Sequence, residues 1–369
     1  MFLALLAETG RPPHATPKYA ETLLGGSVSR LNKKAVVMIS GGLDSTLAAR
    51  IMLDQGVELC GVYLSAPWGC CDKTKAMKVA SALGIDFMVV KMNDEYIRVI
   101  RNPKYGYGSS MNPCIDCRIY MFEKAKELMG QIGASFLVTG EVLGQRPMSQ
   151  MKHSMNLIEE QAGLQRLVVR PLSAKLLLAT IPEEMGVVDR ERLYAVNGRS
   201  RKVQMELAVR YGIVDYPNPA GGCLLTDQQF GQRVKDLFDH QAEIDLEDME
   251  MLRLGRHFRV CESTKLIVGR NERENATLEE YLSPGRVLFK PNGFPGPTTL
   301  LVGPPSDDAN RLAVRVIAHY SRMEQLPPQA QVILQIGMPR EGSSKGEPLN
   351  ETLPLQDSID PTELEQMRI

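Results

Sequence analysis

The sequence predicts an α/β protein, a doubly wound parallel sheet joined to a smaller C-terminal α+β domain. Short apolar runs rich in β-branched residues alternate with helical stretches through the first half of the chain, which is typical of a parallel sheet. A glycine pair, Gly41-Gly42, separates the first of these runs from the first helix. Beyond residue 264 the strict alternation stops, and apolar runs follow one another around a single helical stretch. We therefore expect two folded parts.

The strands and helices of the parallel sheet are predicted in chain order. Residues 33–39 predict the first strand, and residues 46–55 predict a helix that ends at Gly56. Further strands are expected at residues 58–64, 86–91, 135–139 and 167–169, and further helices at residues 72–83 and 119–129. Ligands of such sheets bind beyond the carboxyl ends of the strands. The loops after residues 39, 64 and 139 are therefore expected to converge on one nucleotide.

The turn between the first strand and the first helix is the most informative stretch. Its sequence is Ser40-Gly41-Gly42-Leu43-Asp44-Ser45. The glycines let the backbone approach a ligand closely, and the first amides of a helix have no partners within the helix, so they bind anions. A tight turn with Asp44 or Ser45 as a helix cap is the simpler alternative. The complete pattern between a strand and a helix favours a phosphate-binding turn.

Three of the seven cysteines carry most of the chemical interest. Cys114 and Cys117 form a C-x-x-C pair where a helix begins, and Cys223 follows a glycine pair. Alone, C-x-x-C is compatible with a redox pair, half a zinc site or two small buried side chains. Three thiolates fit a [4Fe-4S] cluster that keeps one iron open, whereas structural zinc takes four ligands. A zinc site completed by His153 or His257 is the weaker alternative.

Two further segments carry polar groups that suit a substrate. The loop after the fourth strand contains Gly140 and Gln145, then Arg146, Ser149 and Gln150, at the expected ligand edge of the sheet. A basic segment with Arg199, Arg201 and Lys202 opens a helix that runs to Tyr211. Either segment is compatible with an ordinary solvated surface. We expect the loop to contact a nucleotide or substrate, and the basic segment to meet phosphates.

Residues from about 33 to 230 resemble the pyrophosphatase-loop (PP-loop) domain of tRNA sulfur-insertion enzymes, most closely the 4-thiouridine synthetase type. The resemblance rests on the Ser40–Ser45 turn, on Thr139-Gly140-Glu141 with the Gly144-Gln145 that follows, and on the placement of the three cysteines. It implies an adenine nucleotide alpha hydrolase-like fold that binds ATP and Mg²⁺. The residues that it assigns to the nucleotide are Ser40, Gly41, Gly42, Asp44, Ser45, Gly140 and Gln145, with Asp44 at Mg²⁺. It assigns Cys114, Cys117 and Cys223 to a [4Fe-4S] cluster, and these cysteines and Asp44 to catalysis.

The same resemblance implies a reaction in two steps on tRNA. A uridine carbonyl oxygen attacks the α-phosphate of ATP and pyrophosphate leaves, and then sulfide carried on the open iron displaces AMP. Known 4-thiouridine synthetases also carry an N-terminal RNA-binding region of the THUMP type, whereas here only some 32 residues precede the first predicted strand of the PP-loop domain. No rhodanese-like segment is recognisable either. The expected sulfur donor is therefore free sulfide or a protein of the cysteine-desulfurase type.

The C-terminal part resembles, more weakly, the small RNA-associated module of ribosome-rescue factors of the fibronectin-binding-like family. Basic residues of this module are interspersed along the chain with two phenylalanines. The basic residues are Arg270, Arg273, Arg286 and Lys290, and the phenylalanines are Phe289 and Phe294. The resemblance implies an RNA backbone bound by the basic residues, with bases stacked on the phenylalanines. An α+β appendage that only packs on the first domain is the alternative. A homodimer is compatible with the sequence, because a second copy would strengthen the grip of a small module on tRNA.

Four segments follow from these patterns. They are a flexible lead-in at residues 1–32, the PP-loop domain at 33–235, a small α+β domain expected to bind RNA at 236–337 and a disordered tail at 338–369. The tail is assigned from its content of glycine, serine, proline and glutamate.

Composition excludes several classes of protein. Lysine and arginine number 43 against 44 aspartates and glutamates, so any RNA site must be a local basic patch. No apolar run is long enough to cross a bilayer, and seven cysteines in 369 residues are too few for a disulfide scaffold. We therefore expect a cytoplasmic protein without a membrane partner.

Several functional alternatives stay open beside 4-thiouridine synthesis. Thiolation at the other uridine carbonyl would make 2-thiouridine. A relay of persulfides through Cys114 and Cys223 would need no iron and would leave Cys117 structural. A PP-loop sulfur transferase or amidating enzyme would act on a small molecule instead of tRNA. A non-catalytic RNA-binding protein would keep the fold without the reaction.

Overall fold

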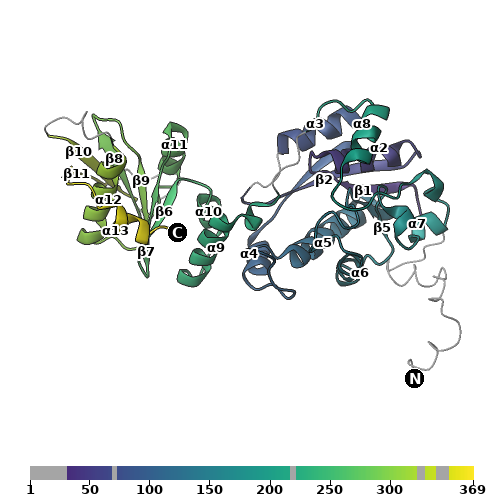
Figure 1. Ribbon diagram of the computed structural model, residues 1–369, viewed down its shortest axis with the longest axis horizontal. Coiled ribbons are helices and arrows are strands. Elements are labelled where there is room, and N and C mark those ends of the chain that lie inside the picture. The colour runs from purple at the N-terminus through teal and green to yellow at the C-terminus, as the bar shows by residue number, and fades with distance from the viewer. Residues whose placement is uncertain (1–30, 69–72, 217–221, 322–328, 338–348) are drawn as a thin grey trace, which may run out of the picture. The chain divides into compact units, whose positions relative to one another are not determined.

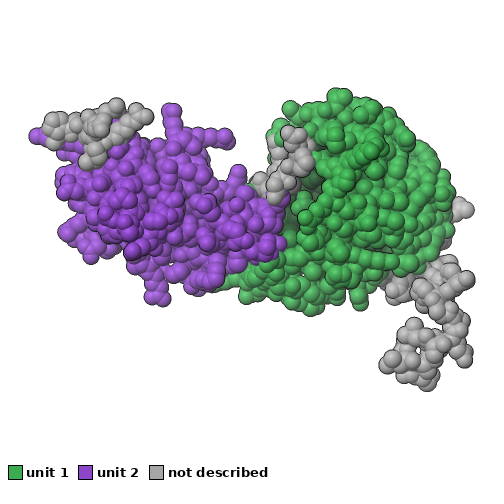
Figure 2. All heavy atoms as spheres, in the orientation of Figure 1, with its two compact units in different colours: residues 1–108, 113–221 green, residues 109–112, 222–369 purple. Residues whose placement is uncertain are grey.

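The computed structural model describes residues 31–68, 73–216, 222–321, 329–337 and 349–369. The chain divides into two compact units: unit 1 comprises residues 1–108 and 113–221, and unit 2 comprises residues 109–112 and 222–369 (Figure 2). Nearly all of the predicted flexible lead-in, residues 1–30, lies outside the described part of the chain. Its end is packed, because Leu31 is buried in a hydrophobic core and the Asn32 side-chain amide donates to the Gly133 carbonyl at 2.8 Å.

Unit 1 contains a five-stranded parallel sheet with the strand order β3-β2-β1-β4-β5 (Figure 1). The strands are β1 Lys34–Met38, β2 Glu58–Ser65, β3 Asp86–Lys91, β4 Phe136–Val138 and β5 Val168–Val169. From β1 the chain adds strands first on one side and later, with β4, on the other. This reversal between β1 and β4 is the switch point at which such sheets bind ligands. The predicted fold class of the first domain is confirmed.

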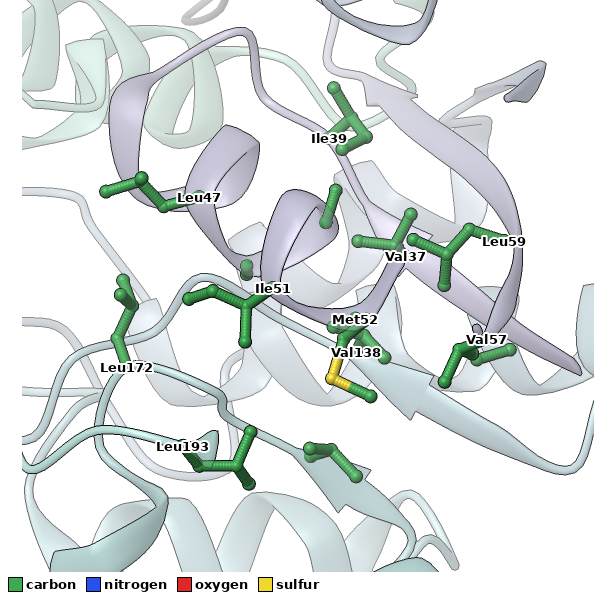
Figure 3. Packing of buried hydrophobic residues seen from close by; sticks show 14 of the residues in the cluster. Val37, Ile39, Leu47, Ile51, Met52, Val57, Leu59, Val138, Leu172 and Leu193 are labelled. Carbon is green, nitrogen blue, oxygen red and sulfur yellow. The ribbon is translucent and has the colours of Figure 1, made fainter. Parts of the chain in front are cut away.

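Helices cover both faces of this sheet. They are α2 Leu43–Leu53, α3 Lys73–Leu83, α4 Asp94–Arg101, α5 Cys114–Ile132, α6 Lys152–Gln161, α7 Ile181–Glu184 and α8 Lys202–Arg210. Because successive strand residues point to opposite faces, Val37 packs with α2 in one core, whereas Val36 packs with α5 and α6 in the other. Figure 3 shows the first of these cores, to which α2 contributes Leu47 and Ile51 and the sheet contributes Val37.

Two helices of unit 1 differ from the prediction in ways that affect the site. Helix α5 begins at Cys114, five residues before the predicted start at Ile119, so both cysteines of the C-x-x-C pair lie in its first turn. Helix α4 was not predicted. It is capped by the Asn93 side chain, which accepts from the Glu95 amide at 3.1 Å, and it brings the buried Tyr96 toward α5.

Unit 2 is built on a six-stranded antiparallel sheet with the order β11-β10-β8-β9-β7-β6. Its strands are β6 Arg256–Cys261, β7 Thr264–Val268, β8 Arg286–Asn292, β9 Thr299–Val302, β10 Gln331–Ile336 and β11 Leu349–Pro354. Its helices are α9 Gln228–His240, α10 Leu246–Met251, α11 Glu272–Glu280, α12 Asp307–Tyr320 and α13 Pro361–Gln366. Side chains of α12 and α13 pack on one face of the sheet, and those of α10 and α11 on the other. Among the described residues of both units, no helix has the length and apolar character needed to cross a membrane.

The end of the chain differs from the predicted disordered tail. Residues 349–354 form β11, which pairs with β10 from Leu349 opposite Ile336 to Pro354 opposite Gln331. Helix α13 follows and buries Leu364 in the core of unit 2. The tail prediction is therefore wrong for residues 349–369, and residues 338–348 lie outside the described part of the chain. The amino-acid composition predicted disorder because β11 is a largely exposed edge strand with few apolar residues.

Two segments at the boundary also belong to unit 2. The division falls after residue 221, not after residue 235 as expected from sequence, because α9 is part of unit 2. Residues 109–112 interrupt unit 1 and join α9: the Gln228 side-chain amide donates to the Ser109 carbonyl at 2.9 Å, and the Ser110 hydroxyl donates to the Asp227 carbonyl at 3.2 Å. A side chain at Gly231 would meet the Ser110 hydroxyl at 2.0 Å, so glycine permits this close approach.

Removing the buried leucine of α13 tests whether the chain end stabilises unit 2. Leu364 is 2% exposed, so Leu364→Ala should lower the free energy of unfolding of unit 2 by about 2 kcal/mol, through lost burial and a residual cavity. Leu349→Ala is the matched control, since Leu349 is 53% exposed and should change stability by less than about 0.5 kcal/mol. Urea unfolding followed by far-UV circular dichroism measures both. Equal effects of the two substitutions would contradict a packed α13.

Candidate nucleotide and thiol site

The turn between β1 and α2 is held by hydroxyl groups. The Ser45 hydroxyl donates to the Gly42 carbonyl at 2.9 Å and accepts from the Ser40 amide at 3.2 Å. The Thr46 hydroxyl donates to the same carbonyl at 3.0 Å. Gly42 is the N-cap of α2 in an extended conformation and supplies no side-chain cap. The first amides of a helix lack intrahelical acceptors, so this turn presents N–H donors and the positive end of the helix dipole to an anion.

Gly41 allows the turn to pass close to helix α3. Its φ is +78°, a left-handed conformation that side chains rarely adopt. A Cβ atom at this position would lie 2.9 Å from the amide nitrogen of Ala76. Conformation and space therefore both require glycine, as the sequence predicts for a turn in close backbone contact.

Gly140 brings the loop after β4 against the first turn of α2. A Cβ atom on Gly140 would lie 2.5 Å from the carbonyl carbon of Asp44 and 2.5 Å from the amide nitrogen of Ser45. All of these are backbone atoms, so no side-chain movement could make room. The structure thus brings together two predicted site segments that are almost a hundred residues apart in sequence, at the switch point of the sheet.

Asp44 is the charged group of this turn. The Gln145 side-chain amide donates to its Oδ2 atom at 3.2 Å. Its Oδ1 atom is buried and has no hydrogen-bond partner among the described residues. A buried carboxylate oxygen without a partner is unfavourable unless a cation or donor joins it. This donor set, an oxygen beside backbone amides at a helix N-terminus, fits Mg²⁺ accompanying a phosphate group.

A buried ionic network lies directly beyond Gly140. Glu141 is 4% exposed, forms an ion pair with Nε of Arg118 at 3.2 Å and accepts a hydrogen bond from Nε of Arg170 at 2.9 Å. Arg170 also pairs with Glu159. Burial by itself raises the pKa of Glu141, but the two guanidinium groups outweigh burial and hold that pKa below its usual value. The network joins α5, α6, the β4 loop and the residue after β5, so it fixes the thiol helix relative to the nucleotide turn.

The sequence alone does not predict this network. Arg118 and Glu141 are 23 residues apart, and a charged residue in a helix or loop is usually solvated, so no local pattern links them. Ser149 and Gln150, which were expected as ligand contacts, are each 4% exposed. The Gln150 carbonyl accepts from the Gly144 amide at 2.7 Å, which shapes the loop.

The cysteines lie in both units. Cys114 and Cys117 occupy the first turn of α5, and the Cys117 sulfur lies 2.9 Å from the Tyr96 hydroxyl. Cys223 lies in unit 2, where its carbonyl accepts from the Thr226 hydroxyl at 2.6 Å. In the parts of the chain that are described, no three His, Cys, Asp or Glu side chains are grouped to hold a metal ion. The [4Fe-4S] cluster therefore stays a prediction.

The histidines of the weaker zinc alternative lie in different units. His257 is 1% exposed in unit 2, and one ring nitrogen lies 2.9 Å from the Leu254 carbonyl. Burial first, and then Lys265 and Arg233, lower the pKa of His257 well below its usual value, so the ring is neutral. His153 lies in unit 1, where its Nε2 atom is 3.2 Å from the Ser154 hydroxyl.

The predicted RNA-binding residues differ in their surroundings. In unit 1, Arg199 and Lys202 are exposed at the start of α8, and Arg201 is half-buried. In unit 2, Arg273 is exposed, whereas Arg270 pairs with Glu274 and Lys290 pairs with Glu279 at 2.7 Å. These assignments stay predictions.

The predicted stacking of bases on phenylalanines is wrong. Phe289 is fully buried and Phe294 is 8% exposed, both in the core beneath α12. Alternation along β8 explains the error, because Phe289 points into the core whereas its neighbour Lys290 points to the other face. Arg286 is 9% exposed, and its guanidinium group forms an ion pair with Glu247 at 2.9 Å within unit 2.

Comparison with known proteins relates both parts of the chain to RNA-associated families. Residues 33–177 match the family described as tRNA methyl transferase HUP domain. Residues 255–351 match the family described as NFACT protein RNA binding domain. These matches agree with the resemblance of the first part to PP-loop enzymes of tRNA thiolation and of the second part to an RNA-associated module. They do not distinguish the 4-thiouridine type or the iron–sulfur class.

Curated relatives cover part of the chain. The tRNA-specific 2-thiouridylase MnmA of Symbiobacterium thermophilum is 26% identical over 229 residues, which is 55% of each protein. The protein of the same name from Syntrophotalea carbinolica is 35% identical over 121 residues, 30% of this chain and 34% of that one. The chain thus spans about half or less of the length of these relatives. A crystal structure of a 4-thiouridine synthetase–RNA complex with bound ATP aligns with a TM-score of 0.31 at 20% identity, covering 48% of this chain and 50% of that one, which is too weak a likeness to argue from.

Proposed function

We propose that this protein is an ATP-dependent tRNA uridine thiolase that forms AMP and pyrophosphate. The observation that carries the proposal is the buried Oδ1 atom of Asp44, which has no hydrogen-bond partner in the described part of the chain and lies in a glycine turn at the switch point of a parallel sheet. A turn of this kind suits the phosphates of ATP. The family matches of residues 33–177 and 255–351 support tRNA as the substrate.

In the proposed first step the turn activates ATP. A uridine carbonyl oxygen attacks the α-phosphorus, the bond to pyrophosphate breaks, and an adenylylated uridine forms. Ser40, Gly41, Gly42 and the first amides of α2 bind the phosphates, while Gly140 keeps the neighbouring loop close and Gln145 orients Asp44. Asp44 would hold Mg²⁺, which would neutralise phosphate charge. Stabilisation of developing charge by fixed amides is the main catalytic contribution of the turn.

In the proposed second step a sulfur nucleophile replaces the activated oxygen. Sulfur attacks the uridine carbon, and AMP leaves with the former carbonyl oxygen. Cys114, Cys117 and Cys223 are the proposed carriers. Sulfide as the donor would be bound unchanged at a metal cluster on these cysteines. A donor of the cysteine-desulfurase type would instead pass persulfide sulfur to Cys114 or Cys223, and the other thiol would release the thiolated uridine by forming a disulfide. A [4Fe-4S] cluster on these three cysteines is the finer proposal, and would bind sulfide at its open iron. Anaerobic purification followed by iron and sulfide analysis, with Cys223→Ala beside the wild type, tests that part.

The position of thiolation is a separate question within the same proposal. The sequence resemblance favours the C4 carbonyl, whereas the names of the curated relatives favour the C2 carbonyl. The two products have the same mass and different retention and absorption. Nucleoside chromatography with mass spectrometry on digested tRNA therefore identifies the carbonyl.

The proposed tRNA contacts come from both units. Arg199, Arg201 and Lys202 in unit 1 would contact phosphates, as would Arg273 in unit 2. Arg270 and Lys290 would first have to leave their glutamate partners. A homodimer is the proposed means of strengthening the grip on tRNA, and light scattering with and without tRNA tests it.

Asp44→Asn tests the proposed function. Removal of the negative charge should lower the rate of tRNA-dependent AMP formation about 100-fold. The fold should be unchanged, since Asn has the shape of Asp and its side-chain oxygen can still accept the hydrogen bond from Gln145. The control is Asp54→Asn at the other end of α2, where Asp54 pairs with Arg50 near the surface and should not affect AMP formation.

The same assay separates the alternatives. AMP formation that does not require tRNA would favour a small-molecule substrate. RNA binding without AMP in the wild type, unchanged by Asp44→Asn, would contradict catalysis and favour a non-catalytic RNA-binding protein.

A further inference from the structure

Three aromatic side chains form a buried stack beside the thiol helix. The ring centroids of Trp68 and Tyr96 are 5.4 Å apart with an interplanar angle of 27°, and those of Tyr96 and Tyr120 are 5.1 Å apart at 32°. Trp68 is fully buried, and Tyr96 and Tyr120 are 1% and 6% exposed. Tyr96 is thus held between two rings, which restricts its own ring to one orientation. The three residues come from the loop after β2, from α4 and from α5.

The two tyrosines of the stack make different polar contacts. The Tyr96 hydroxyl oxygen lies 2.9 Å from the Sγ atom of Cys117. The Tyr120 hydroxyl donates to the Asn93 side-chain oxygen at 2.9 Å, and that oxygen also caps α4. Tyr120 therefore secures the start of α4, whereas Tyr96 contacts a thiol of the C-x-x-C pair.

We propose that Tyr96 is a positioning residue that holds the Cys117 sulfur in a fixed direction and donates a hydrogen bond to it while the sulfur is anionic. An anionic sulfur has no proton to donate, so in this pair the hydroxyl must be the donor. Hydrogen bonds to charged groups are stronger than those between neutral groups, and the stack fixes the geometry of this one. The proposal rests on the proposed thiolase function. It gives Cys117 a role in sulfur transfer, in contrast to the relay alternative, in which Cys117 is structural.

The kinetic test compares Tyr96→Phe with Tyr120→Phe. Each substitution removes one hydroxyl from the same stack and keeps the ring, but only the first hydroxyl contacts Cys117. In Tyr96→Phe the kcat of tRNA thiolation should fall about tenfold, the loss expected for a hydrogen bond to a charged group. The KM for tRNA and for ATP, and the rate of pyrophosphate release in the first turnover, should stay unchanged, because the turn at Asp44 is intact. Tyr120→Phe should change kcat by less than about twofold.

The chain's single tryptophan provides a second readout that needs no activity. Trp68 stacks on Tyr96, so chemical change at Cys117 should alter its fluorescence. The full-length protein is treated with iodoacetamide without ATP or tRNA, and the part of the emission change that disappears in Cys117→Ser is assigned to Cys117. That part should persist in Tyr120→Phe and fall by more than half in Tyr96→Phe.

The outcomes separate the two proposals. Equal behaviour of Tyr96→Phe and Tyr120→Phe in the fluorescence experiment would overturn the role of Tyr96, as would an unchanged kcat in an active Tyr96→Phe enzyme. A wild type that never thiolates tRNA would defeat the proposed function instead. The fluorescence comparison would then still test whether the Tyr96 hydroxyl interacts with the Cys117 sulfur.

Discussion

Gly140→Ala is expected to abolish AMP formation and to destabilise unit 1 by about 4 kcal/mol. The added methyl group would lie 2.5 Å from two backbone atoms of the Asp44–Ser45 peptide, far inside van der Waals contact. Interiors are packed too densely for a helix start to move away without breaking other contacts. The β4 loop and the first turn of α2 would separate, and the phosphate-binding turn would lose its shape. Urea unfolding followed by Trp68 fluorescence measures the stability of unit 1, and AMP release measures the function.

Gly130→Ala is the matched control for this substitution. Gly130 lies inside α5, and a Cβ atom there would have no neighbour within 4 Å. Alanine is a better helix former than glycine, so this change should stabilise unit 1 by about 0.5–1 kcal/mol and leave AMP formation intact. A Gly140→Ala protein with wild-type stability and activity would show that the close approach of these loops is not needed.

Lys265→Met is expected to stabilise unit 2 by about 3 kcal/mol at pH 7. Lys265 lies in β7 and is 3% exposed. Burial lowers its pKa from 10.5 to about 8, although Asp236 partly offsets this by favouring the charged form. A shift of this size corresponds to about 3 kcal/mol of unfavourable interaction of the charged lysine in the folded state. Methionine keeps the apolar stem and removes the buried charge.

The effect of Lys265→Met should depend on pH in a defined direction. Below pH 8 the lysine is charged in both folded and unfolded states, so the folded protein carries the whole unfavourable interaction. As the pH rises from about 8 toward 10.5, the folded state gives up its proton while the unfolded state keeps it, and the wild type gains stability. The advantage of methionine should therefore shrink across this window.

Urea unfolding of unit 2 at pH 7 and pH 10 measures this difference. Far-UV circular dichroism follows both units, and Trp68 fluorescence identifies the transition of unit 1. Lys290→Met is the control, because Lys290 lies in the same sheet but is 34% exposed in its ion pair with Glu279. It should change stability by less than about 1 kcal/mol. A destabilising Lys265→Met would mean that the buried ammonium group contributes favourable contacts.

Sequence patterns predicted the fold of unit 1 because its strands are continuous apolar runs. The runs at Val36–Val37 and Val62 are buried on both faces of the sheet, so apolar content and length identify them without knowledge of their neighbours. The pattern that predicts the phosphate-binding turn is also local, since Gly41 and Asp44 lie within one strand–turn–helix unit. The carboxyl-end rule then related Gly140 to this turn.

The features that sequence did not predict depend on contacts between distant segments. Glu141 is ionised in the interior only because Arg118 and Arg170 reach it from other elements. Tyr96 acquires its contact with Cys117 from the packing of α4 on α5, and no spacing in the chain indicates this. β11 lacks an apolar pattern because one of its edges and most of its side chains are exposed. Its partner strand β10 supplies the order that its own composition does not.

The assignment of residues 109–112 to unit 2 has a consequence for dissecting this protein. The peptide chain passes from one unit to the other after residues 108, 112 and 221, so the units are linked by three covalent connections instead of one. A cut or a new terminus at residue 221 would leave Ser109 and Ser110 on the fragment that carries unit 1, and would remove from α9 the segment that fills the space at Gly231. An isolated C-terminal fragment is thus an incomplete unit. A circular permutant or a fragment supplemented with the 109–112 peptide would restore its missing piece.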